Sequence, residues 1–108
     1  MDFDQYYVVI LKKGPNWTGE PTPELEALQT RHLAHLRQLN EQGLNLISGP
    51  IEDHGDMDRR GISIYRCDAF PSVAALQAEV EADPMFEIGH LAADYLTWYV
   101  PKGSSLGA

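Results

Sequence analysis

The sequence predicts an α+β fold of ferredoxin-like arrangement, a four-stranded antiparallel sheet with two helices on one face in the order β-α-β-β-α-β. Three observations predict it. Four runs of β-branched and aromatic residues are typical of strands, two segments show helical periodicity, and Gly or Pro residues separate most of them. The 108 residues, 44% hydrophobic and 22% charged, suit one domain with a single core.

The first half of the chain predicts a strand, a loop and a long helix. Residues 5–13 (QYYVVILKK) are typical of a strand, and a Gly-Pro pair ends it. The loop 14–23 is rich in Pro and Gly and has Trp17 as its one large apolar residue. A helix is predicted over residues 24–42, because a proline precedes it and Gly43 follows it. One stripe of that helix contains Leu25, Leu28, His32, Leu36 and Leu39.

The second half completes the pattern. Asp83-Pro84 ends the second helix, because the residue before a proline is pushed out of the helical region. We expect residues 1–103 to form one domain and residues 104–108 a flexible tail. The predicted elements are a strand at 44–51, a polar loop at 52–60, a strand at 61–67, a helix at 72–82, a connector at 85–90 and a strand at 93–100.

Composition excludes several classes of protein. A single cysteine, Cys67, cannot form an internal disulfide, so a secreted disulfide scaffold is excluded. No apolar run is long enough to span a bilayer, and the acidic N-terminus does not have the pattern of a secretory signal, so we expect a cytoplasmic protein. The net charge of −8 argues against nucleic acid and anionic membranes as partners.

Both faces of the predicted sheet are apolar. In the first strand Tyr6, Val8 and Ile10 alternate with Tyr7, Val9 and Leu11, and the last strand is similar. Two helices cover only one face, so the other is expected to pack on a second copy of the chain as a homodimer. The alternative is that the tyrosines and tryptophans lie on a hydrated sheet face.

His32 is the most informative polar residue. It lies within the leucine stripe of the first helix, so helix geometry turns it toward the sheet. A buried imidazole needs hydrogen-bond partners, and Asp83 at the end of the second helix is the candidate. Such a His–Asp pair is suited to general acid–base catalysis. The alternatives are that His32 is a satisfied core histidine and Asp83 an ordinary helix-end residue.

Other polar residues give weaker indications. His35 lies at the edge of the same stripe, but no third ligand with a recognisable spacing accompanies the two histidines, so no metal site is predicted. The acidic loop at 52–58 lacks the full calcium-loop pattern, and Cys67 is expected to be a small buried residue. Candidate pocket residues are Ser48, Gly49 and Pro50 at the end of the second strand, with Trp17, Tyr7, Trp98 and Tyr95 as aromatic candidates.

Four stretches resemble the YCII-related (YciI-like) family of the dimeric α/β-barrel superfamily. They are Tyr6 to Leu11; Arg31-His32-Leu33-Ala34-His35-Leu36 with Gly43; Ser48-Gly49-Pro50 with Arg60-Gly61; and Ala82-Asp83-Pro84 with Trp98-Tyr99-Val100-Pro101. Together they cover about residues 5–102.

The resemblance implies a dimeric ferredoxin-like fold with a His–Asp pair in the active site, here His32 and Asp83, and with Ser48 to Pro50 lining the pocket. One related member is associated with dehydrochlorination of a chlorinated hydroquinone-type aromatic, which suggests elimination or proton transfer without a cofactor. The loop 14–23 is longer than in the shortest family members, and Trp17 is expected to cover the pocket.

We therefore expect a cofactor-independent lyase- or isomerase-type enzyme acting on a small organic molecule, with His32 as base or acid and Asp83 orienting it. His35, Trp17 and Tyr7 are expected to help bind the substrate. The alternative is a non-catalytic ligand-binding or assembly module, in which the His–Asp hydrogen bond is structural. A third option, a heme- or metal-assisted monooxygenase, would need a ligand set that the sequence does not offer.

Overall fold

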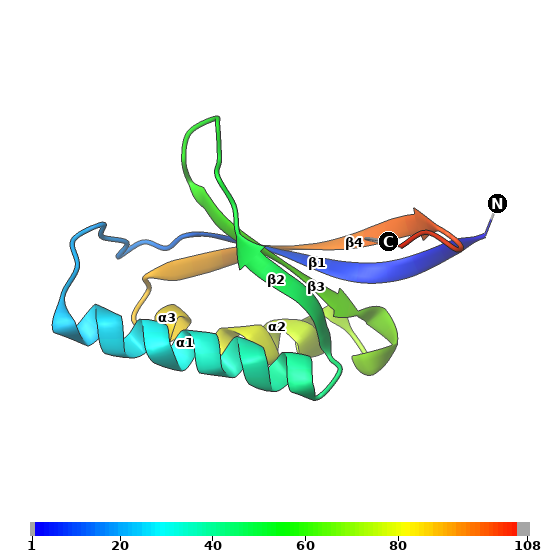
Figure 1. The fold of residues 1–108 in the computed structure, drawn as a ribbon, viewed down its shortest axis with the longest axis horizontal. Coiled ribbons are helices and arrows are strands. Elements are labelled where there is room, and N and C mark those ends of the chain that lie inside the picture. Colours follow the sequence, from blue (N-terminus) through cyan, green and yellow to red (C-terminus); the bar gives the residue numbers. More distant parts are fainter. Residues whose placement is uncertain (1, 106–108) are drawn as a thin grey trace.

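The computed structural model describes residues 2–105 and confirms the predicted α+β class (Figure 1). All four strands join one antiparallel sheet, and two main helices lie along one side of it. In chain order the elements are β1 (Phe3–Lys13), α1 (Pro23–Glu41), β2 (Asn45–Pro50), β3 (Arg59–Arg66), a 3₁₀ turn (Cys67–Ala69), α2 (Val73–Glu81), α3 (Pro84–Glu87) and β4 (Leu91–Pro101).

The strand order β2-β3-β1-β4 is that of the ferredoxin-like arrangement. β1 and β4 pair without a break from Phe3 opposite Pro101 to Lys13 opposite Leu91. This pairing extends both strands beyond the predicted ranges, because backbone hydrogen bonding continues past the runs of aromatic and β-branched residues.

The ends of α1 follow from local chemistry. The Thr22 side chain accepts a hydrogen bond from the N–H of Leu25 (3.1 Å), and Pro23 occupies the first helical turn, where it has no N–H to leave unpaired. After the helix, Gly43 adopts a φ of 76°, a conformation that glycine reaches without strain. These signals place α1 so that its leucine stripe lies over the sheet.

The core lies between the helices and one sheet face. The alternation along β1 decides which residues enter it, since Val9 and Leu11 are buried there while Tyr6 and Ile10 belong to the opposite face. The buried cluster consists of Val9, Leu11, Leu39, Tyr65, Leu76, Val80, Met85 and Leu91.

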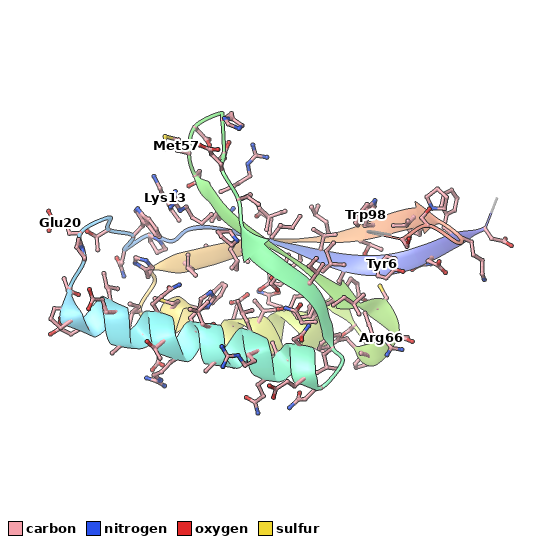
Figure 2. The ribbon with its side chains drawn as sticks, viewed as in Figure 1. Tyr6, Lys13, Glu20, Met57, Arg66 and Trp98 are labelled. Atoms are coloured by element: carbon pink, nitrogen blue, oxygen red, sulfur yellow. The ribbon has the colours of Figure 1, made fainter. Side chains whose placement is uncertain are left out.

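The second sheet face has no helix over it among the described residues (Figure 1). Leu96 is 54% exposed and Trp98 42% exposed, although both are large and apolar. Figure 2 shows Trp98 on β4 and Tyr6 on β1, while the β2–β3 loop, with Met57 near its tip, projects away from the sheet. The chain therefore leaves an apolar sheet face exposed.

At the C-terminal end, the N–H of Ser104 donates to the carbonyl of Pro101 (3.1 Å), so the chain turns directly after β4. Residues 106–108 of the expected tail lie outside the described residues. Within the described part of the chain, no helix combines the length and apolar character needed to cross a bilayer.

Candidate functional site

His32 and Asp83 meet, as the sequence predicts. His32 Nδ1 lies 2.5 Å from Asp83 Oδ2, and both residues are buried, with exposed fractions of 7% and 2%. The two residues are 51 positions apart in the chain, so only the packing of α1 against α3 brings them together.

Each side chain is held by its own element. His32 lies in the middle of the stripe that α1 turns toward the sheet. Asp83 is the N-cap of α3, and its Oδ1 accepts a hydrogen bond from the N–H of Met85 (2.9 Å). For this segment the sequence predicts a connector or a short helical turn, and the cap orients the Asp83 carboxylate toward α1.

The electrostatic balance keeps Asp83 ionised. Burial alone would raise the pKa of Asp83, but the hydrogen bonds from His32 and from the Met85 N–H, together with the nearby histidines, outweigh it and lower the pKa. A carboxylate only accepts hydrogen bonds, so His32 Nδ1 must carry the proton that is shared with it.

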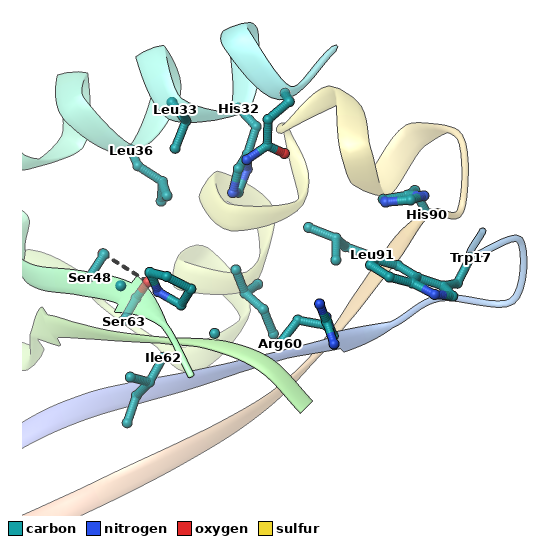
Figure 3. A pocket seen from close by; sticks show the side chains of 15 residues that line it. Trp17, His32, Leu33, Leu36, Ser48, Arg60, Ile62, Ser63, His90 and Leu91 are labelled. Atoms are coloured by element: carbon teal, nitrogen blue, oxygen red, sulfur yellow. Dashed lines mark hydrogen bonds between the residues drawn. The ribbon is translucent and has the colours of Figure 1, made fainter. Parts of the chain in front are cut away.

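The other nitrogen of His32 is free. Nε2 makes no hydrogen bond within the described residues, and it is not among the buried nitrogens that lack a partner. His32 lines a cavity between α1 and the sheet, and Figure 3 shows its ring pointing into that space. With the proton on Nδ1, Nε2 presents a lone pair to the cavity.

The cavity has a volume of about 460 Å³ and opens to solvent, since exposed side chains such as Leu33 and Arg60 form part of its wall. This volume is within the range of small-molecule sites. Its lining comes from α1, the end of β2, the start of β3, the loop after β1 and the start of β4.

Ser48 and Ser63 line the cavity near β2, and hydrogen bonds hold both side chains. Asn45 Nδ2 donates to Ser48 Oγ (2.5 Å), and Ser48 Oγ donates to Ser63 Oγ (2.9 Å, Figure 3). Burial raises the pKa of Tyr65, and hydrogen bonds from Asn45 and Ser63 to its hydroxyl offset part of that rise.

Trp17 closes the other end of the cavity. Its ring stacks on His90, with centroids 4.3 Å apart and an interplanar angle of 29°, and the guanidinium of Arg60 lies 5.0 Å from the Trp17 centroid. Figure 3 shows these three side chains grouped beside Leu91. Burial lowers the pKa of His90, so its ring is neutral near pH 7.

The Trp17 loop is fastened to the segment before β4. The N–H of Gly14 donates to the carbonyl of His90 (2.9 Å), and the N–H of Asn16 donates to the carbonyl of Gly89 (2.9 Å). A Cβ at position 14 would lie 2.2 Å from the Gly89 carbonyl oxygen, so only glycine fits this approach.

We predict that Gly14→Ala destabilises the protein by roughly 1–3 kcal/mol, because two backbone segments must separate to admit the methyl group. Gly19→Ala is the matched control in the same loop, since a Cβ there meets nothing within 4 Å. Urea unfolding of both variants tests this. Equal midpoints for the two variants would contradict the close approach.

The structure brings most of the predicted site residues together. Ser48, Gly49, Pro50 and Trp17 line the same cavity as His32. His35 does not line it. Its Nδ1 lies 3.4 Å from Asp83 Oδ2 without hydrogen-bond geometry, in a small space behind the pair.

Tyr7 lies elsewhere, in a separate hollow with Arg66 and Cys67. The main cavity is also lined by residues that were not among the predicted site residues, and the polar ones are Gln29, Arg60, Ser63 and His90. Arg60 stood within a motif of the family resemblance, whereas nothing in the local sequence distinguishes Ser63 or His90. Within the described residues, no group of three or more His, Cys, Asp or Glu side chains could hold a metal ion.

Fold and site together define a ferredoxin-like α+β protein with a buried His–Asp pair whose free imidazole nitrogen faces an open cavity. The chain matches no family model and no curated protein. The resemblance to YCII-related proteins therefore stays a prediction based on the quoted motifs.

Proposed function

We propose that this protein is a small-molecule enzyme of the lyase or isomerase type that works by general acid–base catalysis without a cofactor. One observation carries the proposal, namely that Asp83 holds one nitrogen of His32 while the other nitrogen faces a solvent-connected cavity. A histidine with a purely structural role would be expected to have both nitrogens enclosed by packing.

The proposed chemistry is a proton transfer at Nε2 of His32. This nitrogen removes a proton from an acidic C–H of the substrate, and the ring becomes an imidazolium that the Asp83 carboxylate stabilises. In an elimination, the C–H electron pair forms a double bond and a leaving group such as chloride departs with its own electron pair. In an isomerisation, Nε2 returns the proton to a different carbon.

The cavity supports this proposal in two further ways. Leu33, Leu36 and Leu91 provide an apolar wall, and Trp17 provides an aromatic surface, as a small ring-bearing substrate requires. The resemblance to YCII-related proteins, one of which is associated with dehydrochlorination, points to the same class of reaction.

The second candidate is a non-catalytic ligand-binding or assembly module. The buried His32–Asp83 hydrogen bond also joins α1 to the start of α3, which is a structural role in itself. The two candidates differ in whether a bound ligand is changed chemically.

Proton exchange in D₂O distinguishes the enzyme from the non-catalytic binding module. Candidate molecules with acidic C–H bonds are incubated with the protein, and ¹H NMR follows the replacement of their protons by deuterium. A general base at His32 is expected to accelerate exchange or turnover of at least one compound. A ligand that binds in the cavity without protein-dependent exchange or turnover would favour the binding module.

We further propose that the exposed sheet face pairs with a second copy of the chain. Tyr6, Leu46, Ile64, Trp98 and Val100 line a hollow on this face, and large apolar patches normally mark interaction sites. A closed two-fold pair would cover the same patch on both chains.

Trp98→Lys is expected to shift the protein from twice the mass of one chain to the mass of one chain, because it places a charge in the apolar patch. Tyr99→Lys is the matched control, since Tyr99 is 57% exposed on the same strand but points to the opposite face. Size-exclusion chromatography with light scattering measures both. A monomeric wild-type protein at micromolar concentration would contradict the dimer.

A further inference from the structure

The cavity differs from the rest of the molecule in its charge. The chain has 16 acidic residues and a net charge of −8, yet no Asp or Glu is among the residues that line the cavity. Arg60 is the only lining residue that is charged at every physiological pH. An otherwise acidic protein thus lines this site with one fixed positive charge, and Lys13 Nζ lies nearby, 5.8 Å from the Trp17 centroid.

Arg60 also differs from its neighbours in having unused donors. Arg59, the preceding residue, forms an ion pair with Asp53 (2.9 Å), and Arg66 on the same strand forms one with Asp68 (2.9 Å). The Arg60 guanidinium makes no hydrogen bond or ion pair within the described residues and lies beside the Trp17 ring. Its N–H groups are therefore available to a ligand.

The Trp17 contact suits the binding of an anion. A guanidinium beside an aromatic face loses conformational freedom, while the N–H donors in its own plane stay accessible. Two parallel N–H groups of arginine match the two oxygens of a carboxylate. Arg60 is the one arginine or lysine among the lining residues, so its single charge matches a carboxylate, whereas a phosphate carries up to two negative charges.

The same end of the cavity contains a second unsatisfied group. His90 is buried, with 8% of its surface exposed, and its Nδ1 has no hydrogen-bond partner among the described residues. Figure 3 shows Arg60, Trp17 and His90 together at one end, with His32, Leu33 and Leu36 along α1. The cavity therefore has a polar, cationic end and an apolar wall that leads to His32.

We propose that the substrate is a small carboxylate whose anionic group binds Arg60 beside Trp17 while its apolar body extends toward His32. The statement that this carboxylate is a substrate, and not only a bound ligand, rests on the proposed function. The binding preference itself does not depend on turnover.

The test uses matched pairs of an acid and its uncharged amide: butyrate and butyramide, benzoate and benzamide, cinnamate and cinnamamide. Binding to the ¹⁵N-labelled full-length protein is followed through the indole N–H of Trp17, identified with Trp98→Phe, and through the His32 ring. We expect at least one acid to bind about tenfold more tightly than its amide.

Arg60→Gln is expected to weaken binding of that acid by about tenfold or more and to leave the amide nearly unchanged. Arg37→Gln, an exposed arginine of α1 outside the cavity, is the matched control and should change neither. The inference is overturned if no acid is preferred over its amide, or if Arg60→Gln and Arg37→Gln behave alike.

The outcomes also separate this inference from the proposed function. An Arg60-dependent preference for acids in a protein that catalyses no exchange would overturn the enzyme and retain the carboxylate site. Catalysis that depends on His32 but prefers uncharged molecules would overturn the carboxylate site and retain the enzyme.

Discussion

Replacing Asp83 with alanine is expected to lower the free energy of unfolding by about 3 kcal/mol, the lower end of the range for breaking a buried pair. The lower end applies because His32 is able to remain neutral once its partner is gone. The variant also loses the cap that accepts the Met85 N–H, so α3 should loosen as well. Urea unfolding at pH 7 measures the change.

Asp68→Ala is the matched control for this substitution. Asp68 also forms an ion pair, with Arg66, but its side chain is 72% exposed, and such pairs contribute little to stability. We expect a loss below about 1 kcal/mol. Similar losses for the two alanine variants would show that the His32–Asp83 pair does not stabilise the fold more than a surface pair does.

The pH dependence gives a second measurement on Asp83. Its pKa is lowered in the folded protein, so its stabilising contribution is present above the ordinary value of 3.8 and is lost as the pH falls through the lower, folded-state pKa. The stability difference between wild type and Asp83→Asn should therefore shrink below about pH 4. Asp53, whose pKa is also lowered, is present in both proteins and cancels in the difference.

Replacing His32 with alanine is expected to lower turnover of any substrate found in the exchange assay by about 10²- to 10⁴-fold, the usual contribution of a general acid or base. His35→Ala is the matched control, because His35 is one turn away and near the same carboxylate but does not line the cavity. Its effect should be much smaller. Equal losses would indicate that the cluster acts through structure alone.

Two further measurements distinguish a chemical role of His32 from a structural one. Added imidazole should restore part of the activity of His32→Ala, since the cavity opens to solvent beside the vacated position. Asp83→Asn should also be impaired. If the oxygen of the introduced Asn side chain accepts from the Met85 N–H, the side-chain NH₂ group faces His32 Nδ1 and donates to it. The ring proton then lies on Nε2, which is no longer able to act as a base. Full activity in Asp83→Asn would contradict the proposed base.

The inward direction of His32 and the carboxylate at the end of the second helix were predictable because each depends on a local pattern. The leucine stripe around His32 turns that ring inward, and the proline after Asp83 places a carboxylate where the second helix ends. Strand ends were less predictable, because β1 and β4 extend wherever their backbones find partners. Tyr7 shows a similar limit. Alternation along a strand predicts which sheet face a side chain lies on, but not how far along the strand the cavity is, and Tyr7 lines a different hollow.

Periodicity and residue chemistry act over a few positions, so the residues alone indicate the order of elements, the inward direction of His32 and an apolar surplus on the sheet. The packing of the folded chain is needed to bring Arg60, His90 and Trp17 together at one end of the cavity and to place Ser63 beneath it. Those residues come from separate strands and loops. Their approach depends on strand register and on the contact of Gly14 with Gly89, neither of which is encoded in any short segment.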